Sequence, residues 1–156
     1  MVTIFFNKKG FSLLELLIVV LIASTLMAIA ALSMDYVRKQ RVTSAAKQIV
    51  ADIQQARVNG TMSGGGSTVV FVSPTTYAVN GVNKNLSSVR IWIVNGVTLV
   101  PPSNNAVTLN RFGYSNTMAV AVNTAGVTGY TRCFNIGMMT IQEGFWSDST
   151  STCQVQ

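Results

Sequence analysis

The chain offers few side chains that could carry out chemistry. It contains no histidine and five carboxylates among 156 residues, and its net charge is +6. Without histidine there is no imidazole zinc site and no imidazole general base. Glu143 and Asp148 are the pair of acids in the C-terminal half, where they could flank a scissile bond or, with neighbouring hydroxyls, bind calcium. Solvated loop acids are the commoner explanation, so we expect no enzyme, metal or cofactor.

Glu15 has the most unusual setting of the five acids. It is the one charged residue in the apolar run from Phe11 to Leu32. At about 1.5 Å per residue, a helix of this length would cross a hydrocarbon core of about 30 Å. A charge near the centre of a membrane helix costs about 2.5 to 3.5 kcal/mol on insertion scales, so such residues usually have a partner and a role. We therefore interpret Glu15 as a paired functional carboxylate.

The flanking charges predict how the chain crosses the membrane. Lys8 and Lys9 precede the apolar run, so the short N-terminal head should stay in the cytoplasm and the residues after Leu32 should lie outside. An external location permits disulfides, and we predict that the two cysteines, Cys133 and Cys153, pair with each other. Two unrelated buried thiols are the alternative.

The residues after Leu32 continue as an amphipathic helix. One apolar stripe recurs at spacings of four and three, while charged and amide residues occupy the other faces. The stripe consists of Val42, Ala46, Ile49, Ile53 and Ala56. Asn59-Gly60 supplies the expected stop, and no proline occurs between Phe11 and Asn59. We expect one helix of about 70 Å, with its first half in lipid and its second half against a globular domain.

The second half of the chain has the composition of a β-domain. A flexible hinge, SGGGS at residues 63–67, is followed by short β-rich runs separated by turn signals such as Asn95-Gly96. The runs are TVVFV, TTYAV, VRIWIV, VTLV, AVTLN, MAVAVN and YTRCFNI. They predict an antiparallel β-domain whose apolar face is covered by the stripe of the helix, giving an α+β fold.

The aromatic residues of this half alternate with aliphatic ones, which predicts that most of them pack in the core. They are Tyr77, Trp92, Phe112, Tyr114, Tyr130, Phe134, Phe145 and Trp146. The adjacent pair Phe145-Trp146 stands beside polar residues. We expect this pair to be exposed and available for contacts with a partner or another subunit.

The N-terminus resembles the type IV pilin and type II secretion pseudopilin superfamily. The matching residues are Lys8-Lys9-Gly10-Phe11-Ser12-Leu13-Leu14-Glu15, followed by Leu16 to Ile22. The resemblance implies a pilin-like fold, cleavage between Gly10 and Phe11 by a prepilin peptidase, and N-methylation of Phe11. It also implies that Glu15 pairs with the N-terminal amine of Phe11 in a neighbouring subunit, an attraction that is strong at low dielectric. Many pilins close a C-terminal loop with a cysteine pair, here a loop from Glu143 to Cys153.

A closer likeness extends to about residue 72. The segment AAKQIVADIQQARVNGTMSGGGSTVVF is similar to the H-type pseudopilin and FimT/FimU minor-pilin group, where a helix ends in an Ala-Arg pair, here Ala56-Arg57. Many pilins carry proline at the position of Leu32 and glycine at that of Ser24, so melting of this helix on assembly is not implied. Residues 137–140, GMMT, lack the arginines of the Gly-Arg-x-Arg motif in FimT-type DNA receptors.

These expectations combine into one domain scheme. It comprises a prepilin leader at 1–10, a transmembrane and assembly half of the helix at 11–32, an amphipathic half at 33–60, and a β-rich globular domain at 61–156.

The alternative for the N-terminus is an ordinary signal peptide that is cut after Ala28-Ile29-Ala30. The apolar run argues against it, because the run is longer than the apolar region of such peptides and contains a carboxylate.

Our hypothesis is a structural pilin or pseudopilin that starts as a single-pass prepilin in the inner membrane, with its C-terminus outside. It would then enter a cell-surface type IV pilus or a periplasmic type II secretion pseudopilus. Expected partners are other pilins or copies of the chain, the prepilin peptidase and the inner-membrane assembly machinery. The alternative is a minor tip pilin that primes assembly or acts as a DNA-uptake receptor. Basic residues beyond the helix are spread thinly, so we expect weak DNA binding.

Overall fold

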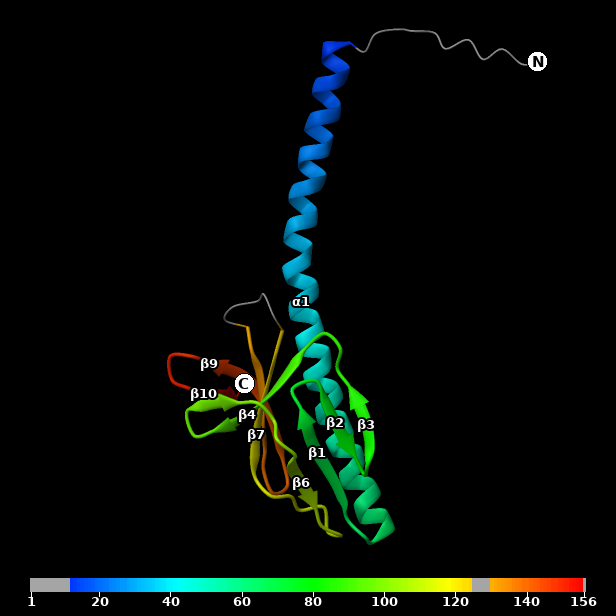
Figure 1. Cartoon of the computed structure of the whole chain (residues 1–156), viewed down its shortest axis with the longest axis vertical. Coiled ribbons are helices and arrows are strands. Elements are labelled where there is room, and N and C mark those ends of the chain that lie inside the picture. The colour runs from blue at the N-terminus through cyan, green and yellow to red at the C-terminus, as the bar shows by residue number, and fades with distance from the viewer. Residues whose placement is uncertain (1–11, 125–129, 156) are drawn as a thin grey trace, which may run out of the picture. The chain divides into compact units, whose positions relative to one another are not determined.

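The computed structural model describes residues 12–124 and 130–155. Within them, helix α1 (Leu13–Ser63) is followed by ten strands. The strands are β1 (Ser67–Ser73), β2 (Thr76–Val79), β3 (Val82–Asn85), β4 (Arg90–Asn95), β5 (Thr98–Val100), β6 (Asn105–Leu109), β7 (Met118–Asn123), β8 (Arg132–Ile136), β9 (Ile141–Ser147) and β10 (Thr152–Val155). This α+β, pilin-like architecture confirms the predicted fold class (Figure 1).

The strands form two antiparallel sheets. One has four strands in the order β3-β2-β1-β6, and the other has six in the order β10-β9-β8-β7-β4-β5. The chain divides between Tyr36 and Val37 into two compact units, the second of which holds both sheets and the C-terminal half of α1. All ten strands and the helix residues from Val37 onward therefore belong to one domain.

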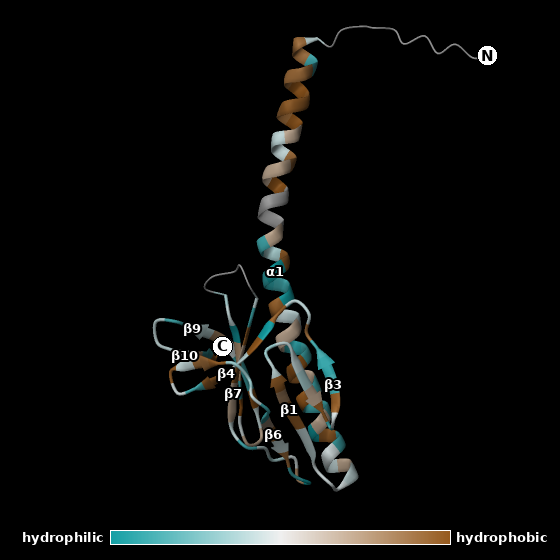
Figure 2. Ribbon diagram, in the orientation of Figure 1, coloured by the Kyte–Doolittle hydropathy of each residue, from teal (hydrophilic) through white to brown (hydrophobic). Residues whose placement is uncertain are grey.

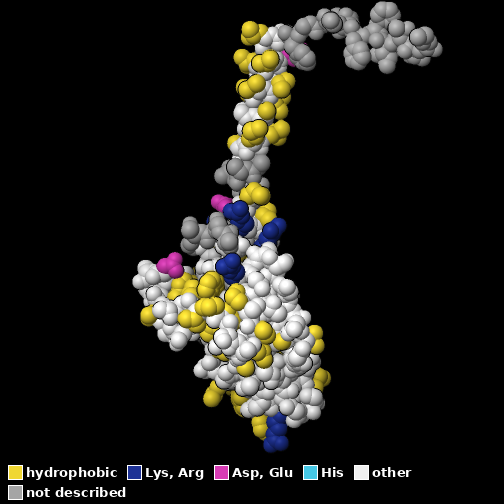
Figure 3. Space-filling model, viewed as in Figure 1, with side chains coloured by type: hydrophobic (Ala, Val, Ile, Leu, Met, Phe, Trp, Pro, Cys, Tyr) yellow, Lys and Arg dark blue, Asp and Glu magenta, His cyan; other side chains and the backbone are white. Residues whose placement is uncertain are grey.

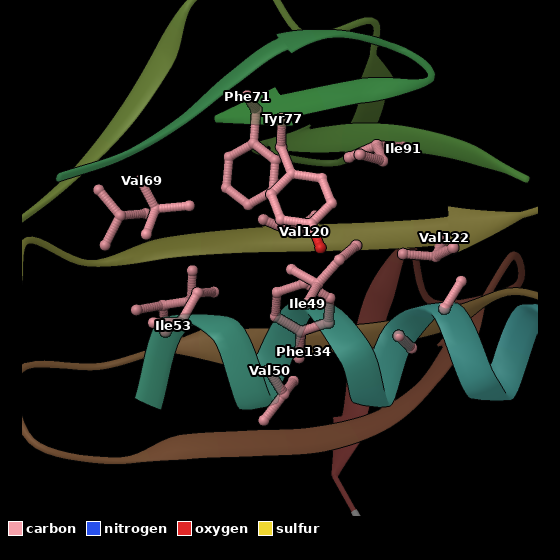
Figure 4. Close-up of a cluster of buried hydrophobic side chains, with 14 of the residues drawn as sticks. Ile49, Val50, Ile53, Val69, Phe71, Tyr77, Ile91, Val120, Val122 and Phe134 are labelled. Atoms are coloured by element: carbon pink, nitrogen blue, oxygen red, sulfur yellow. The ribbon is translucent and has the colours of Figure 1, made fainter. Parts of the chain in front are cut away.

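The core of this domain lies between the stripe of α1 and both sheets, as the periodicity predicted. All five stripe residues, from Val42 to Ala56, are buried. Figure 4 shows side chains from α1 meeting aromatic and aliphatic side chains from both sheets. The labelled residues are Ile49, Val50, Ile53, Val69, Phe71, Tyr77, Ile91, Val120, Val122 and Phe134. Removing this apolar area from water is the main stabilisation of the fold.

The helix extends beyond the predicted stop at Asn59-Gly60 and ends at Ser63. Gly60 is buried within the helix, and a Cβ on it would lie 2.9 Å from the carbonyl carbon of Gly66. The glycine therefore allows the returning chain to approach the helix closely. The reversal itself is made by Gly64 and Gly66, whose φ values of 68° and 77° favour glycine.

Three strands were not predicted from the sequence: β3, β9 and β10. Strand β3 reads VNKN and pairs with β2 through a turn in which Asn80 and Gly81 both have positive φ. Strands β9 and β10 pair with each other, Trp146 opposite Cys153. The segment from Glu143 to Cys153, predicted as a loop held by the disulfide, is a β-hairpin whose second strand carries the bonded Cys153. Polar strands of this kind are held by cross-strand pairing rather than by apolar content.

The prediction that Phe145-Trp146 is an exposed pair is also wrong for Trp146, whose side chain is buried. It joins a second apolar cluster with Ala121 and Cys133, and Trp92 packs against that cluster. Alternate residues of a strand lie on opposite faces of the sheet, so this cluster covers the face of the six-stranded sheet that points away from the main core.

Candidate functional site

The first half of α1 is an apolar surface that the single chain leaves uncovered. Its large hydrophobic side chains from Leu13 to Ile29 are between 47% and 83% exposed. Figure 2 shows this half of the helix as mostly hydrophobic. By length and composition this half of the helix can cross a membrane. A helix that is hydrophobic on all sides needs lipid or other protein around it.

Glu15 lies in the first turn of this helix and is exposed. The backbone N–H groups of Glu15 and Leu16 donate to the carbonyl oxygen of Ser12 at 2.9 and 3.2 Å, so the helix begins directly after Ser12. A carboxylate in the first turn interacts favourably with the helix dipole. Gly10 and Phe11, the predicted cleavage and methylation sites, lie outside the described residues, so the pairing of Glu15 with Phe11 stays a prediction.

Two hydroxyl groups in the same segment are satisfied inside the helix. Ser24 Oγ donates to the Leu21 carbonyl at 2.9 Å, and Thr25 Oγ1 donates to the Ile22 carbonyl at 2.8 Å. Neither hydroxyl therefore needs a partner in lipid. A carboxylate only accepts hydrogen bonds and cannot be satisfied by these carbonyls, so Glu15 is the residue of this segment whose chemistry calls for a partner.

The structure contains the predicted disulfide between Cys133 and Cys153, with the two Cα atoms 5.8 Å apart. The bond joins β8 to β10, two strands separated in the sheet by β9. Gly144 of β9 lies opposite Cys133. A Cβ on Gly144 would lie 2.0 Å from the Gln154 carbonyl oxygen, so the glycine permits β10 to fold closely over β9. The disulfide thus fixes the last hairpin to the sheet.

A buried polar group that the sequence did not reveal connects α1 to the four-stranded sheet. Tyr77 Oη donates to Asp52 Oδ2 at 2.5 Å, and Lys84 Nζ donates to Asp52 Oδ1 at 2.7 Å. The sequence placed Asp52 on a polar face of the helix, whereas its side chain is only 18% exposed. Burial, followed by the hydrogen bond and charge of Asp52, raises the pKa of Tyr77 above its ordinary value.

We expect Asp52→Ala to lower the free energy of unfolding by about 2 kcal/mol, because the buried Tyr77 hydroxyl and the Lys84 ammonium lose their acceptor. Chemical denaturation of the full chain in detergent measures this. The matched control is Gln54→Ala, an exposed residue of the same helix. Equal stability of both variants would contradict the assignment.

The raised pKa of Tyr77 also makes the stability depend on pH. Because this pKa is higher in the folded chain than in the unfolded chain, the contribution of Tyr77 to the free energy of unfolding is fully present below about pH 10 and is lost as the pH rises beyond it.

The structure does not bring Glu143 and Asp148 together as a site. Glu143 forms an ion pair with Arg132 at 3.8 Å, and the Arg132 guanidinium lies 4.3 Å from the centre of the Phe145 ring. Asp148 lies in the exposed turn between β9 and β10. Within residues 12–124 and 130–155, no group of three or more acids or cysteines is arranged to hold a metal ion.

Comparison with known families supports the interpretation of the N-terminus. Residues 5–31 match the prokaryotic N-terminal methylation motif. Neither a curated protein nor a solved structure matches the chain. The motif supports the type IV pilin and pseudopilin class, processing by a prepilin peptidase and assembly with other pilins. With the apolar helix, it is consistent with a precursor anchored in the inner membrane. The closer likeness to H-type pseudopilins and FimT/FimU stays a prediction.

Proposed function

We propose that the chain is a structural subunit of a type IV pilus or a type II secretion pseudopilus. In this proposal the leader is removed between Gly10 and Phe11, Phe11 is methylated, and the apolar half of α1 leaves the membrane to pack among the helices of other subunits. The observation that carries the proposal is one carboxylate, Glu15, at the start of an exposed apolar helix and within the residues that match the methylation motif.

The proposed role of Glu15 follows from its environment. In lipid its charge lacks a compensating partner, which is costly. In a filament, the positive N-terminal amine of Phe11 on a neighbouring subunit would compensate that charge in a medium of low dielectric. The same residue would thus favour departure from the membrane and fix the axial position of a docking subunit.

We expect Gly10→Val to block maturation, because the peptidase requires a small residue before the cleaved bond at the cytoplasmic face. Cells that express the variant with a prepilin peptidase should contain full-length protein that does not enter filaments. The measurement is the intact mass of the protein from membranes, compared with the mass of the wild-type chain. Normal removal of residues 1–10 from the variant would reject the prepilin interpretation.

DNA binding should be weak and non-specific, which separates a structural subunit from a DNA-uptake receptor. Arg90 lies opposite Asn123 at one end of β7. Arg111 lies in the turn between β6 and β7, which leads toward the other end of β7. This turn is held near the end of β8 by a hydrogen bond from Ser115 N to the carbonyl oxygen of Met138. Arg132 is engaged by Glu143. Arg90 and Arg132 lie at the same end of the six-stranded sheet, but their neighbouring register positions place them on opposite faces, and Arg111 lies toward the other end. The three arginines therefore do not form one basic face. Submicromolar affinity at physiological salt that is lost when all three are replaced would instead favour the uptake receptor.

A further inference from the structure

The end of α1 and two turns form a small, open pocket around the Arg57 side chain. The turn after β6 packs on the helix, since a Cβ on Gly113 would lie 3.2 Å from Arg57 Cγ. The turn after β8 is held by Arg57 Nη1, which donates to the Met139 carbonyl oxygen. The pocket has a volume of about 270 Å³ and is lined around Arg57 by Val58, Thr61, Phe112, Tyr114 and Met139. We call it the Arg57 pocket.

The guanidinium of Arg57 is incompletely satisfied. Its Nε and Nη2 atoms are buried and have no hydrogen-bond partner among the described residues. Leaving a buried charged donor unpaired is expensive. The N–H groups of Nε and Nη2 lie side by side on one edge of a guanidinium, and this planar fork matches the two oxygens of a carboxylate. The unfilled donors therefore suit a carboxylate, which is the acceptor of this shape that a protein chain itself supplies.

The walls of the Arg57 pocket can admit such a group. Phe112 and Met139 line the pocket and are 65% and 66% exposed, so packing does not fix either side chain in place. The Arg111 guanidinium lies 4.8 Å from the centre of the Phe112 ring and adds a second positive charge at the rim. Figure 3 shows hydrophobic and basic side chains together at the lower end of the domain. The Arg57 pocket, with a second arginine at its rim, is suited to an acidic group presented by protein.

Of the five acidic residues of this chain, only one has a carboxylate that is both exposed on the domain and available to bind Arg57. Asp52 and Glu143 are engaged by Lys84 and Arg132, and Asp35 also has an interaction. Glu15 lies in the apolar half of the helix. Asp148 is exposed at the tip of the β9–β10 hairpin and forms no hydrogen bond or ion pair within the described part of the chain. Figure 1 shows that hairpin well apart from the end of α1.

We propose that the Arg57 pocket binds the Asp148 carboxylate of a second copy of this chain. Small hydroxyl side chains flank Asp148, so the hairpin tip is narrow. The two surfaces are different parts of the domain, so the contact is heterologous. A bound pair of copies keeps one free pocket and one free tip, so the interaction can repeat along an open assembly. The inference deepens the proposed function, on which it rests, by naming a contact between globular domains.

Cysteine crosslinking in the full-length chain tests the contact. Thr61→Cys places a thiol in the Arg57 pocket, and Ser149→Cys places one beside Asp148. Two differently tagged copies, each with one substitution, are expressed together and treated with a membrane-permeant oxidant. We expect a mixed dimer from the pair and none from either variant alone. Dimers of Thr61→Cys with itself would indicate a symmetric contact and would overturn the proposal.

Charge substitutions at the exposed tip provide the second measurement without disturbing the core. Adding Asp148→Asn or Asp148→Lys to the Ser149→Cys copy should reduce the mixed dimer by about tenfold, as expected for loss of a desolvated charge pair. The matched control, Thr150→Lys, changes the charge of the same turn but keeps the carboxylate, and should reduce the dimer much less. Equal yields from Asp148→Asn and the unchanged turn would overturn the proposal.

A third pair of copies separates this inference from the proposed function. Leu21→Cys reports association through the apolar helix. Crosslinking at Leu21 without any between Thr61 and Ser149 would reject the Arg57 contact and leave the filament proposal intact. Crosslinking between Thr61 and Ser149 without any at Leu21 would support the contact and count against assembly through the helix. Failure of both pairs would reject both proposals.

Discussion

Glu15→Val is expected to abolish incorporation of the chain into filaments while leaving its insertion in the inner membrane unchanged or improved. Valine removes a charge from the membrane segment, where such a charge costs up to about 2.5 to 3.5 kcal/mol at the centre of the helix, so insertion should not suffer. It also removes the group that would compensate the amine of Phe11 in the neighbouring subunit. The measurement is the ratio of filament-associated to membrane-associated protein, with the variant as the sole subunit.

Thr25→Val is the matched control for this experiment, because it makes a similar change in the same exposed helix. The Thr25 hydroxyl is already satisfied by the Ile22 carbonyl, so its loss should leave assembly close to the wild-type level. Wild-type incorporation of Glu15→Val would show that the carboxylate does not fix the position of the subunit. Equal loss in both variants would point to helix packing rather than charge.

The elements that the sequence predicted are those with a periodic apolar pattern. The stripe from Val42 to Ala56 faces the core because its spacing follows one face of a helix. Strands such as β1 and β4 could be recognised because branched residues alternate between buried and more exposed positions. Strand β3 could not, since its residues are mostly exposed and their conformation depends on pairing with β2.

The functional residues likewise divide into those with a local sequence signal and those whose role depends on distant contacts. Glu15 stands out in the sequence because a charge within an apolar run is costly wherever the chain folds. Asp52 and Arg57 do not stand out, because acids and arginines on an amphipathic helix normally face solvent. Their roles depend on Tyr77 and Met139, which lie 25 and 82 residues further along the chain. Long-range contacts of this kind carry no local signal in one sequence.

Removal of the disulfide is expected to have the largest effect on the globular domain. Strand β10 is at the edge of its sheet and mostly exposed, so few apolar contacts hold it. Closing a loop with a sequence separation of 20 contributes about 3 kcal/mol in the chain-entropy model, a substantial part of the stability of a small domain. Replacing both Cys133 and Cys153 with alanine should therefore lower the free energy of unfolding by about this amount.

The loss of stability should be confined to the last hairpin, because Cys133 lies in β8 within the sheet whereas Cys153 lies in the edge strand β10. In the double alanine variant, we expect faster hydrogen exchange in β10 and new proteolytic cleavage at the β9–β10 turn, with little change in β1 or β7. Intact mass with and without reductant, followed by peptide mapping, establishes the bond in protein from its native compartment. Two free thiols there, or a bond to a second chain, would show that the last hairpin is not secured by an intramolecular disulfide.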